Sequence, residues 1–431
     1  MTIDLERRTI RLELRTVRKV RARIIPFLFT LYVVAFLDRV NVGFAALTMN
    51  KALDITSQQF GLLAGIFFLG YFFFEIPSNL LLHKLGARVW IARILISWGI
   101  VSLCTGFAQT AVHMYIVRFL LGIAEAGFFP GMILYLTYWF RQRERAQAVA
   151  LFMAALPVSN VIGAPVSGLI LDHVHWLGIG SWRWLLALEA IPAIVLGIAT
   201  WFLLPNGPEE AGFLDLEEKD WLRDELKRES ARQPAVSAAA ALASSRVWHL
   251  AAIYFTLVVG LYVMSFWLPQ VVNGLSGHFS NTIIGVLVMI PHAVGLAVMV
   301  MVSRNSDRTG ERRYHVAIPA VAAAIALFTV GPVRSPMFSI ALLTIMAAGI
   351  YSFLGPFWAL PSQFLTGYAA ASGIALINSV GNLGGFVGPY MIGSLTRWTG
   401  SMSWGLVFAG VSLLAAAVLV ICVRPCSQPS S

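Results

Sequence analysis

Four ionisable residues lie inside long apolar stretches of the first half of the sequence: Asp38, Arg39, Arg118 and Glu125. Each costs about 2.5–3.5 kcal/mol to insert at the centre of a membrane span, so several together need a reason. Arg118 and Glu125 are seven residues apart, which on a helix places them on one face and roughly 10 Å apart. Arginine binds carboxylates through paired hydrogen bonds, and a desolvated carboxylate can exchange a proton. This pattern predicts a site for an organic anion and a proton.

The apolar composition excludes a soluble protein. Of the 431 residues, 58% are hydrophobic and 12% are charged, with a mean hydropathy of +0.76; soluble domains have roughly twice that share of charge. Three cysteines are too few for a disulfide scaffold. No Walker loop, HExxH or GxSxG motif indicates ATP use or an enzyme. We therefore predict a polytopic membrane protein that is not an enzyme and has no metal or cofactor.

Twelve apolar runs are long enough to cross a bilayer core as helices. We predict spans at 24–46, 59–82, 89–109, 112–139, 146–171, 182–204, 247–272, 281–303, 315–332, 336–361, 369–396 and 404–423. The polar segment 205–246 separates two six-helix bundles, 24–204 and 247–423. Residues 1–23 form a tail that is either flexible or lies on the membrane surface, and 424–431 form a second tail.

The basic residues lie mostly on one side of the predicted spans. Of 31 Lys and Arg residues, 24 fall in the two tails, in 205–246 and in the loops on that side. By the positive-inside rule both termini are cytoplasmic. The net charge of +10 thus orients the chain in a membrane, which we expect to be a bacterial inner membrane, and does not indicate a nucleic-acid partner.

The two predicted bundles are related by a constant offset of 224 residues. Gly86-Ala87-Arg88 corresponds to Gly310-Glu311-Arg312, and Pro165 corresponds to Pro389. The same offset takes the four ionisable residues to neutral ones: Tyr262, Val263, Leu342 and Gly349. A charge needed only for packing would be kept in both halves. The asymmetry therefore favours function over the alternative, a buried ion-pair network that fixes helix register.

Other polar residues within the runs are weaker candidates. Glu75 and Arg93 lie near the cytoplasmic ends of their runs, where we expect them to pair with loop residues and guard a gate. Glu189 is interpreted as structural. Neutral substrate contacts are expected from Asn41, Tyr262, Trp267, Gln270, His292, Trp358, Asn378 and Asn382. The last two asparagines are favoured because an unpaired amide within a span is costly.

Two loop segments resemble a motif of the major facilitator superfamily. Ser306-Asp307-Arg308-Thr309-Gly310-Glu311-Arg312-Arg313 is similar to its Asp-Arg-x-Gly-x-Arg-Arg loop, whereas the first-half copy, His83–Arg88, has His where Asp is usual. The resemblance implies an all-α fold with two pseudo-symmetric halves that hold a substrate between them. Together with Glu75, the charged residues of these loops are expected to act in gating: Lys84, Arg88, Asp307, Arg308 and Arg312.

Three more segments resemble the anion:cation symporter family of that superfamily: Phe36–Ala45, Arg118–Gly131 and Asn378–Phe386. Its members take up organic anions such as tartrate, phthalate, hydroxyphenylacetate and sugar acids, typically with protons. The resemblance implies that Asp38 and Glu125 bind protons and that Arg39 and Arg118 contact the substrate. We expect a monomer in which protonation of Glu125 releases Arg118 to hold a carboxylate. Tartrate ranks slightly ahead of the other acids.

Several alternatives stay open at this point. Sodium could replace the proton, because the sequence does not separate the two. A proton-coupled exporter of metabolites or drugs would share the fold, although we expect it to have an acidic, mainly apolar pocket instead of paired arginines. A receptor without transport activity would leave the acid–arginine cluster unexplained.

Overall fold

The computed structural model describes residues 2–232, 243–276, 278–333, 335–361 and 367–423. These residues form helices and connecting segments without strands, and 11 helical segments among them are long and apolar enough to span a membrane. The predicted all-α polytopic fold is confirmed. Large apolar side chains such as Phe73, Phe202 and Ile318 are exposed on the outside of the bundle, as expected where lipid replaces water.

The helices follow the predicted order. The first half contains α1 (Thr2–Ala52), α2 (Ser57–Leu85), α3 (Ala87–Thr105), α4 (Ala111–Glu125), α5 (Phe128–Thr137), α6 (Gln142–Met153), α7 (Ala155–His173), η1 (Trp176–Gly178) and α8 (Ser181–Leu203). The central segment contains η2 (Pro208–Glu210) and α9 (Leu216–Arg232). The second half contains α11 (Ser245–Asn273), α12 (Asn281–Thr309), α13 (Arg313–Val330), α14 (Pro336–Ser352), α15 (Leu354–Ala359), α16 (Gly367–Asn382), α17 (Gly384–Thr399) and α18 (Ser403–Ile421).

Four predicted spans fold as two helices each. The fourth and tenth spans become α4/α5 and α14/α15, and the fifth and eleventh become α6/α7 and α16/α17. The eleventh span, α16/α17, is not among the 11 membrane-spanning segments of the described residues. At the first break Gly127 has φ of +85°, a conformation in which glycine lacks the steric cost of a side chain. The interruptions occur in the same spans of both halves.

Helix packing repeats between the two halves. In the first half α3 packs against α8 and α2 against α4, and in the second half α13 packs against α18 and α12 against α14. Thr56 caps α2 and Ser280 caps α12, each accepting a hydrogen bond from the backbone N–H three residues later. These caps are 224 residues apart. The duplicated six-helix unit inferred from the sequence is therefore visible in both packing and capping.

The two halves meet along two equivalent helix pairs, α2 with α17 and α7 with α12. A Cβ atom added to Gly61 would lie 2.4 Å from the carbonyl oxygen of Pro389, and one added to Gly285 would lie 2.3 Å from that of Ala164. Neither contact leaves room for a side chain. Gly61 and Gly285 are again 224 residues apart. Small residues at such interfaces let membrane helices approach closely.

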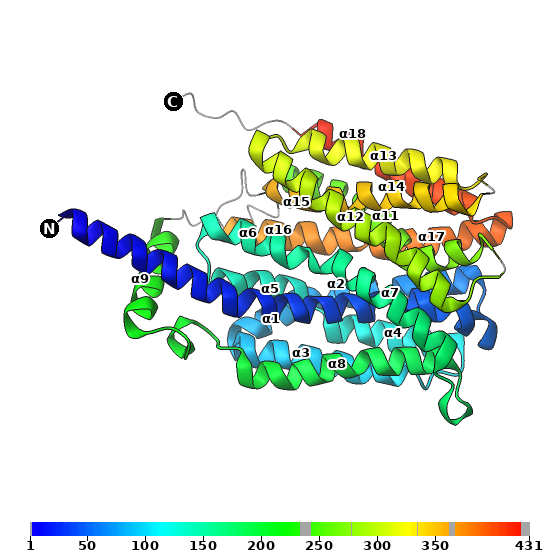
Figure 1. Ribbon diagram of the computed structural model, residues 1–431, viewed down its shortest axis with the longest axis horizontal. Helices are drawn as coiled ribbons and strands as arrows, with labels where there is room; N and C mark the ends of the chain where they lie inside the picture. Colours follow the sequence, from blue (N-terminus) through cyan, green and yellow to red (C-terminus); the bar gives the residue numbers. More distant parts are fainter. Residues whose placement is uncertain (1, 233–242, 277, 334, 362–366, 424–431) are drawn as a thin grey trace.

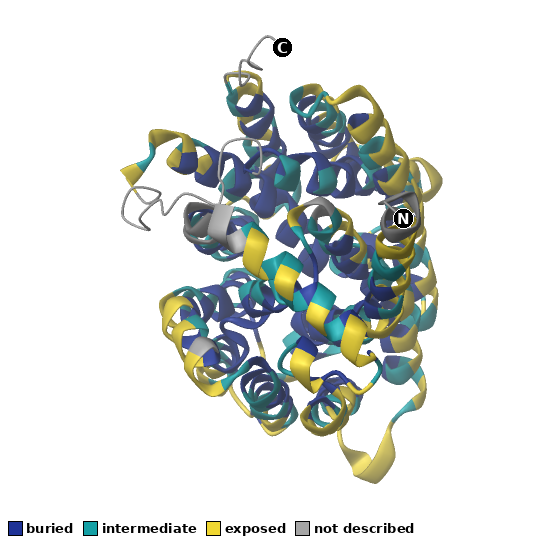
Figure 2. Ribbon diagram, turned by 90° about the vertical axis from the view of Figure 1, so that its left-hand side faces the viewer, coloured by how far each residue is buried: buried dark blue, intermediate teal, exposed yellow. Residues whose placement is uncertain are grey.

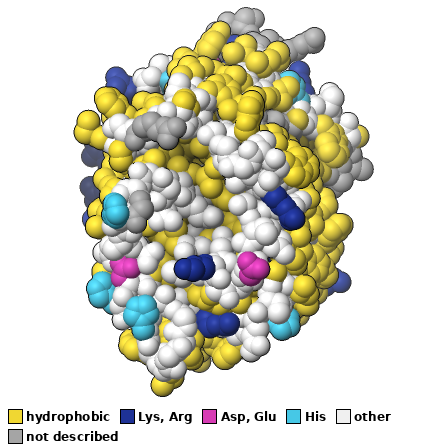
Figure 3. Space-filling model, turned by 90° about the vertical axis from the view of Figure 1, so that its right-hand side faces the viewer, with side chains coloured by type: hydrophobic (Ala, Val, Ile, Leu, Met, Phe, Trp, Pro, Cys, Tyr) yellow, Lys and Arg dark blue, Asp and Glu magenta, His cyan; other side chains and the backbone are white. Residues whose placement is uncertain are grey.

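The helices run along the long axis of the molecule (Figure 1), and the N-terminal part of α1 projects beyond the bundle beside α9. We call this the α9 end and the other the opposite end. Seen from the α9 end, buried residues face the inside of the bundle and exposed residues its outer faces (Figure 2). The opposite end shows few Lys and Arg side chains (Figure 3). The predicted first span starts at residue 24, whereas α1 is helical from Thr2.

Candidate functional site

Three of the four ionisable residues are joined in one buried cluster. Arg39 of α1 forms an ion pair with Glu125 at the end of α4, through Nη2 and Oε1. Its Nη1 donates a hydrogen bond to the hydroxyl of Tyr262 on α11, at 2.8 Å. Arg118 Nη2 donates to the backbone carbonyl of Arg39, at 3.3 Å. All are buried, so the cluster links two helices of the first half to one of the second.

Close packing of α2 against α4 positions this cluster. A Cβ atom on Gly122 would lie 2.0 Å from the carbonyl oxygen of Phe67, so the two backbones approach at a distance that only glycine permits. The Phe67 ring then lies under both guanidinium groups, 5.2 Å from Arg39 Cζ and 5.4 Å from Arg118 Cζ. Arginine over an aromatic face is a favourable arrangement at a buried position.

Arg118 is a buried cation without a paired anion. No carboxylate of the described residues lies within ion-pair distance of it, and its Nε atom has no hydrogen-bond partner. Asp38 and Glu125 are close enough to interact with it electrostatically. A buried charge that lacks a partner is costly. The Arg118 guanidinium therefore has donors free for an anionic ligand.

Asp38 lies beside this cluster with polar partners of its own. Its Oδ1 atom accepts hydrogen bonds from Ser102 Oγ of α3 at 2.5 Å and from Asn41 Nδ2 at 3.2 Å. No ion pair joins it to an arginine of the described chain. The site thus holds one ion-paired carboxylate, Glu125, and one hydrogen-bonded carboxylate, Asp38.

Glu75 connects the two halves. It is fully buried; Oε1 accepts a hydrogen bond from Asn378 Nδ2 at 2.8 Å and Oε2 accepts one from Ser379 Oγ at 2.6 Å. The expectation that Glu75 pairs with loop residues is wrong, because its partners are on α16. The same contact occupies the amide of Asn378, which was predicted to bind substrate. No carboxylate of the described loops forms an ion pair with Arg93 either. Its Cζ atom lies over the Trp90 ring, 4.4 Å from the ring centre.

The remaining neutral candidates, Trp358, Asn382 and Gln270, have different surroundings. Trp358 of α15 packs against Phe129 and Tyr254, with ring centres 6.2 and 4.9 Å away. Asn382 is buried at the end of α16. The half-buried Gln270 has an amide nitrogen without a partner. None of the three contacts the Arg39–Glu125 pair through a described hydrogen bond.

The predicted gating residues of the loops form contacts within their own halves. Arg88 Nε donates to Leu204 O at 2.6 Å, and its guanidinium pairs with Glu210. Hydrogen bonds from Asn206, with Arg88 beside it, lower the pKa of Glu210. Arg312 Nη1 pairs with Asp307 at 2.6 Å, and Lys84 and Arg308 are exposed.

Sequence reasoning missed several partners of the cluster. Ser102 and Ser379 donate hydrogen bonds to the buried carboxylates of Asp38 and Glu75. A serine within an apolar run gives no sequence signal for such a contact. A second cross-half contact joins Asn160 Nδ2 of α7 to the Tyr351 hydroxyl of α14 at 3.3 Å, and His292 Nδ1 lies 2.7 Å from the same hydroxyl. A search for polar residues at matched depths in facing spans would have found them.

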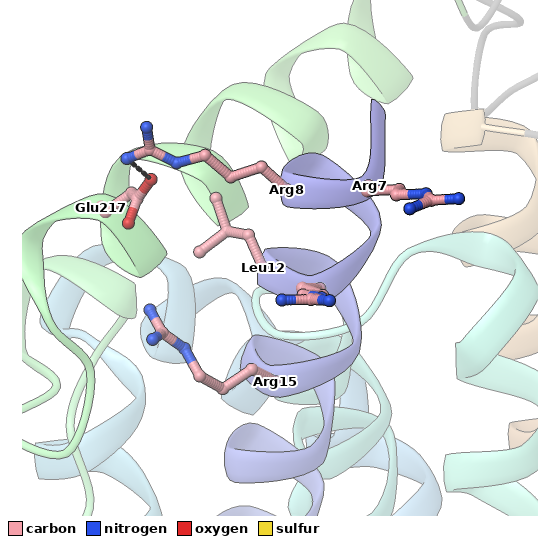
Figure 4. A pocket seen from close by; sticks show the side chains of 6 residues that line it. Arg7, Arg8, Leu12, Arg15 and Glu217 are labelled. Atoms are coloured by element: carbon pink, nitrogen blue, oxygen red, sulfur yellow. Dashed lines mark hydrogen bonds and ion pairs between the residues drawn. The ribbon is translucent and has the colours of Figure 1, made fainter. Parts of the chain in front are cut away.

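A basic hollow lies beside the N-terminal part of α1 (Figure 4). It is lined by Arg7, Arg8, Arg11, Leu12, Arg15 and Glu217. Arg8 pairs with Glu217 at 3.1 Å and Arg15 with Asp215 at 3.0 Å, which holds α1 against the segment of α9. At 1.5 Å per helical residue, Arg15 is about 35 Å from Asp38. This surface is separate from the buried cluster.

Comparisons with known proteins agree with the fold. The family model described as Major Facilitator Superfamily matches residues 28–389. A protein of Agrobacterium vitis named "Putative tartrate transporter" is 48% identical over 412 residues, 95% of this chain and 91% of its own. A "Quinolone resistance transporter" of Acinetobacter baumannii is 39% identical over 410 residues, 94% of each chain.

Solved structures show the same architecture. The xylose transporter of E. coli, in a partially occluded inward-open conformation, superposes with a TM-score of 0.76 over 95% of this chain and 99% of its own, at 14% identity. A bacterial homologue of the human lysosomal transporter Spinster, in an inward-facing and occupied conformation, gives a TM-score of 0.69 at 17% identity, over 93% and 94% of the two chains. These likenesses establish the fold alone.

Proposed function

Because the chain belongs to the Major Facilitator Superfamily, we propose that it is a secondary transporter that imports a small organic carboxylate together with protons. The observation that carries this proposal is the buried Arg118 guanidinium without an anionic partner, next to the Arg39–Glu125 pair. Two buried arginines suit a carboxylate, which accepts hydrogen bonds from the planar guanidinium in pairs.

The coupling step follows from the competition between Glu125 and the substrate for one arginine. The sequence-based mechanism had protonated Glu125 release Arg118, but the partner of Glu125 is Arg39. Protonation of Glu125 removes its charge and frees Arg39, so that Arg39 and Arg118 together can hold the substrate carboxylate. When the carboxylate leaves, Glu125 loses its proton and pairs with Arg39 again.

Contact between the halves transmits this change. Arg39 also donates to Tyr262 of the second half, so the arginine that binds the substrate belongs to the interface that must open. Rocking of two such halves around a central site is the general mode of alternating access in this architecture. We assign the α9 end to the cytoplasm and the chain to a bacterial inner membrane, on the basis of the basic residues in its tails and loops.

The substrate class rests on the cluster and on one group of relatives. The 48% identical protein of Agrobacterium vitis carries a tartrate transporter name, and a small hydroxy-dicarboxylate fits a site with two arginines and neighbouring amide and hydroxyl groups. We therefore place tartrate first, ahead of sugar acids and aromatic acids.

Proteoliposomes with an internal pH dye test the proposal. Addition of tartrate, galactonate, phthalate or 4-hydroxyphenylacetate outside should acidify the lumen for one of these acids. Glu125→Gln should abolish acidification but keep exchange of labelled substrate between the two sides, since exchange needs no net proton movement. Asp224→Asn, on the exposed surface of α9, is the matched control. Acidification that survives in Glu125→Gln contradicts the role of Glu125, and sodium-dependent uptake without acidification assigns the coupling to sodium.

Export is the second candidate function. It is favoured by the 39% identical protein of Acinetobacter baumannii, whose name refers to quinolone resistance. An exporter would move its substrate into vesicles with an acidified lumen, in exchange for protons that leave them. Quinolone accumulation in cells with and without the protein, measured beside tartrate uptake, separates the two functions.

A further inference from the structure

Glu189 is a buried carboxylate that the proposed coupling step does not use. It lies on α8, whose neighbours are α1, α3 and α7. Its Oε1 atom accepts a hydrogen bond from Ser167 Oγ of α7 at 2.7 Å, and its Oε2 atom is buried without a partner. No Lys, Arg or His of the described chain forms an ion pair with it. The charged group that acts on it is another carboxylate, Asp38.

Asn41 lies between these two acids. Its Nδ2 atom donates to Asp38 Oδ1 at 3.2 Å, and its helix, α1, packs against α8, the helix that carries Glu189. Its Oδ1 atom is buried and has no donor. Glu189 Oε2 and Asn41 Oδ1 are thus two buried acceptors on neighbouring side chains, and neither has a hydrogen to share.

A proton on Glu189 resolves this conflict. An ionised carboxylate only accepts hydrogen bonds, whereas a protonated one has an O–H donor. With a proton on Oε2, Glu189 donates to Asn41 Oδ1, Asn41 donates to Asp38, and Ser167 and Ser102 donate to the two acids. Every group in this chain of hydrogen bonds then has a partner, provided that Glu189 is neutral and Asp38 is ionised.

We propose that Glu189 is a second proton-binding residue of the first half, linked to Asp38 through the side chain of Asn41. Turning the Asn41 amide over interchanges its donor and acceptor, and the network is then satisfied with the proton on Asp38 and Glu189 ionised. The pair therefore holds one proton in either arrangement. The facing groups on the surrounding helices are Asp38 and Asn41 on α1, Ser102 on α3 and Ser167 on α7.

Infrared difference spectroscopy tests the assignment directly. The purified protein in lipid should show the carbonyl stretch of a buried carboxylic acid at neutral pH. Glu189→Gln should remove that band, and Ser167→Ala should shift it, because Oε1 loses its donor. Glu225→Gln, on α9, is the control and should leave the band unchanged. A band that persists in Glu189→Gln and does not move in Ser167→Ala overturns the proposal.

Proton counting gives a second measurement. Alkalinisation of the wild-type protein should release one proton more per molecule than that of Glu189→Gln, and Asp38→Asn should leave Glu189 to titrate alone, in a single step. Equal release by the wild type and Glu189→Gln also overturns the proposal. Its meaning for transport rests on the proposed function, but these measurements need no substrate. If the wild type moves no protons with substrate while the band is present, the proposed function alone fails.

Discussion

Replacing each arginine of the buried cluster separately should have unequal effects on folding stability and similar effects on substrate binding. Arg118 makes one long hydrogen bond, to a backbone carbonyl at 3.3 Å, so its loss in Arg118→Gln costs about 1 kcal/mol at most. Removing an unpaired buried cation also offsets part of that cost. Arg39 has an ion pair with Glu125 and a hydrogen bond to Tyr262. Breaking such a buried pair costs about 3–5 kcal/mol.

The predicted effect on the substrate is large for both variants. Removal of one member of a buried charged contact costs about 2–5 kcal/mol of binding free energy, which corresponds to about 30-fold to several thousand-fold in Kd. Arg118→Gln should therefore retain the thermal stability of the wild type while it loses the substrate. Arg39→Gln should lose both.

Calorimetric titration of the purified protein and a thermal unfolding scan in the same detergent measure the two quantities. Arg304→Gln, an exposed arginine on α12, controls for loss of positive charge. Wild-type affinity in Arg118→Gln would refute the assignment of this residue to the substrate. A collapse of thermal stability in Arg118→Gln would mean that it has a structural role, as in a register-fixing ion-pair network.

Three other variants probe the interface between the halves. Tyr262→Phe removes the acceptor that orients Arg39 and should weaken binding by about 0.5–1.5 kcal/mol, measured in the same titration; tighter binding would show instead that Tyr262 competes with the substrate. Asp172 accepts four hydrogen bonds from the first turn of α12, so Asp172→Asn should weaken closure of the opposite end by about 1 kcal/mol, seen as faster labelling of a cysteine placed there. Unchanged labelling would contradict a role of these Asp172 hydrogen bonds in keeping the opposite end closed. Glu75→Ala leaves two donors of α16 unpaired and should lower the free energy of unfolding by about 1–3 kcal/mol, whereas a Kd change above about tenfold would place Glu75 in the binding site.

The fold could be predicted from the sequence because membrane spans follow simple rules. Apolar length sets the number of spans, and the 224-residue offset predicts two equivalent halves, which the structure shows in the matching close contacts of Gly61 and Gly285 at the interface. The helix interruptions could not be predicted in the same way. The break at Gly127 depends on a positive φ value, and nothing in the hydropathy of 112–139 marks it.

The sequence predicted which residues belong to the site better than it predicted which of them interact with each other. Helical spacing showed that Arg118 and Glu125 share a face of α4, but it contains no information about which residue of α1 lies opposite. That choice depends on the close approach of α2 and α4 at Gly122 and on the rotation of α1, both of which are tertiary properties. The partners of Glu75 were predicted wrongly for the same reason, since they are more than 300 positions away in the sequence, on α16.

The charges of the site support the proposed coupling of a proton to the substrate. Arg39 and Arg118 balance Asp38 and Glu125, so the empty cluster is neutral when all four are ionised. A bound carboxylate adds one negative charge to this buried cluster, and a proton on Glu125 restores neutrality. A dicarboxylate adds a second charge, which Asp38 can balance in the same way. Tyr262 is the second-half residue that touches the cluster through a described hydrogen bond, and it is neutral. The charges that balance one another therefore all belong to the first half. The second half can move relative to the first without separating a positive from a negative charge of the cluster.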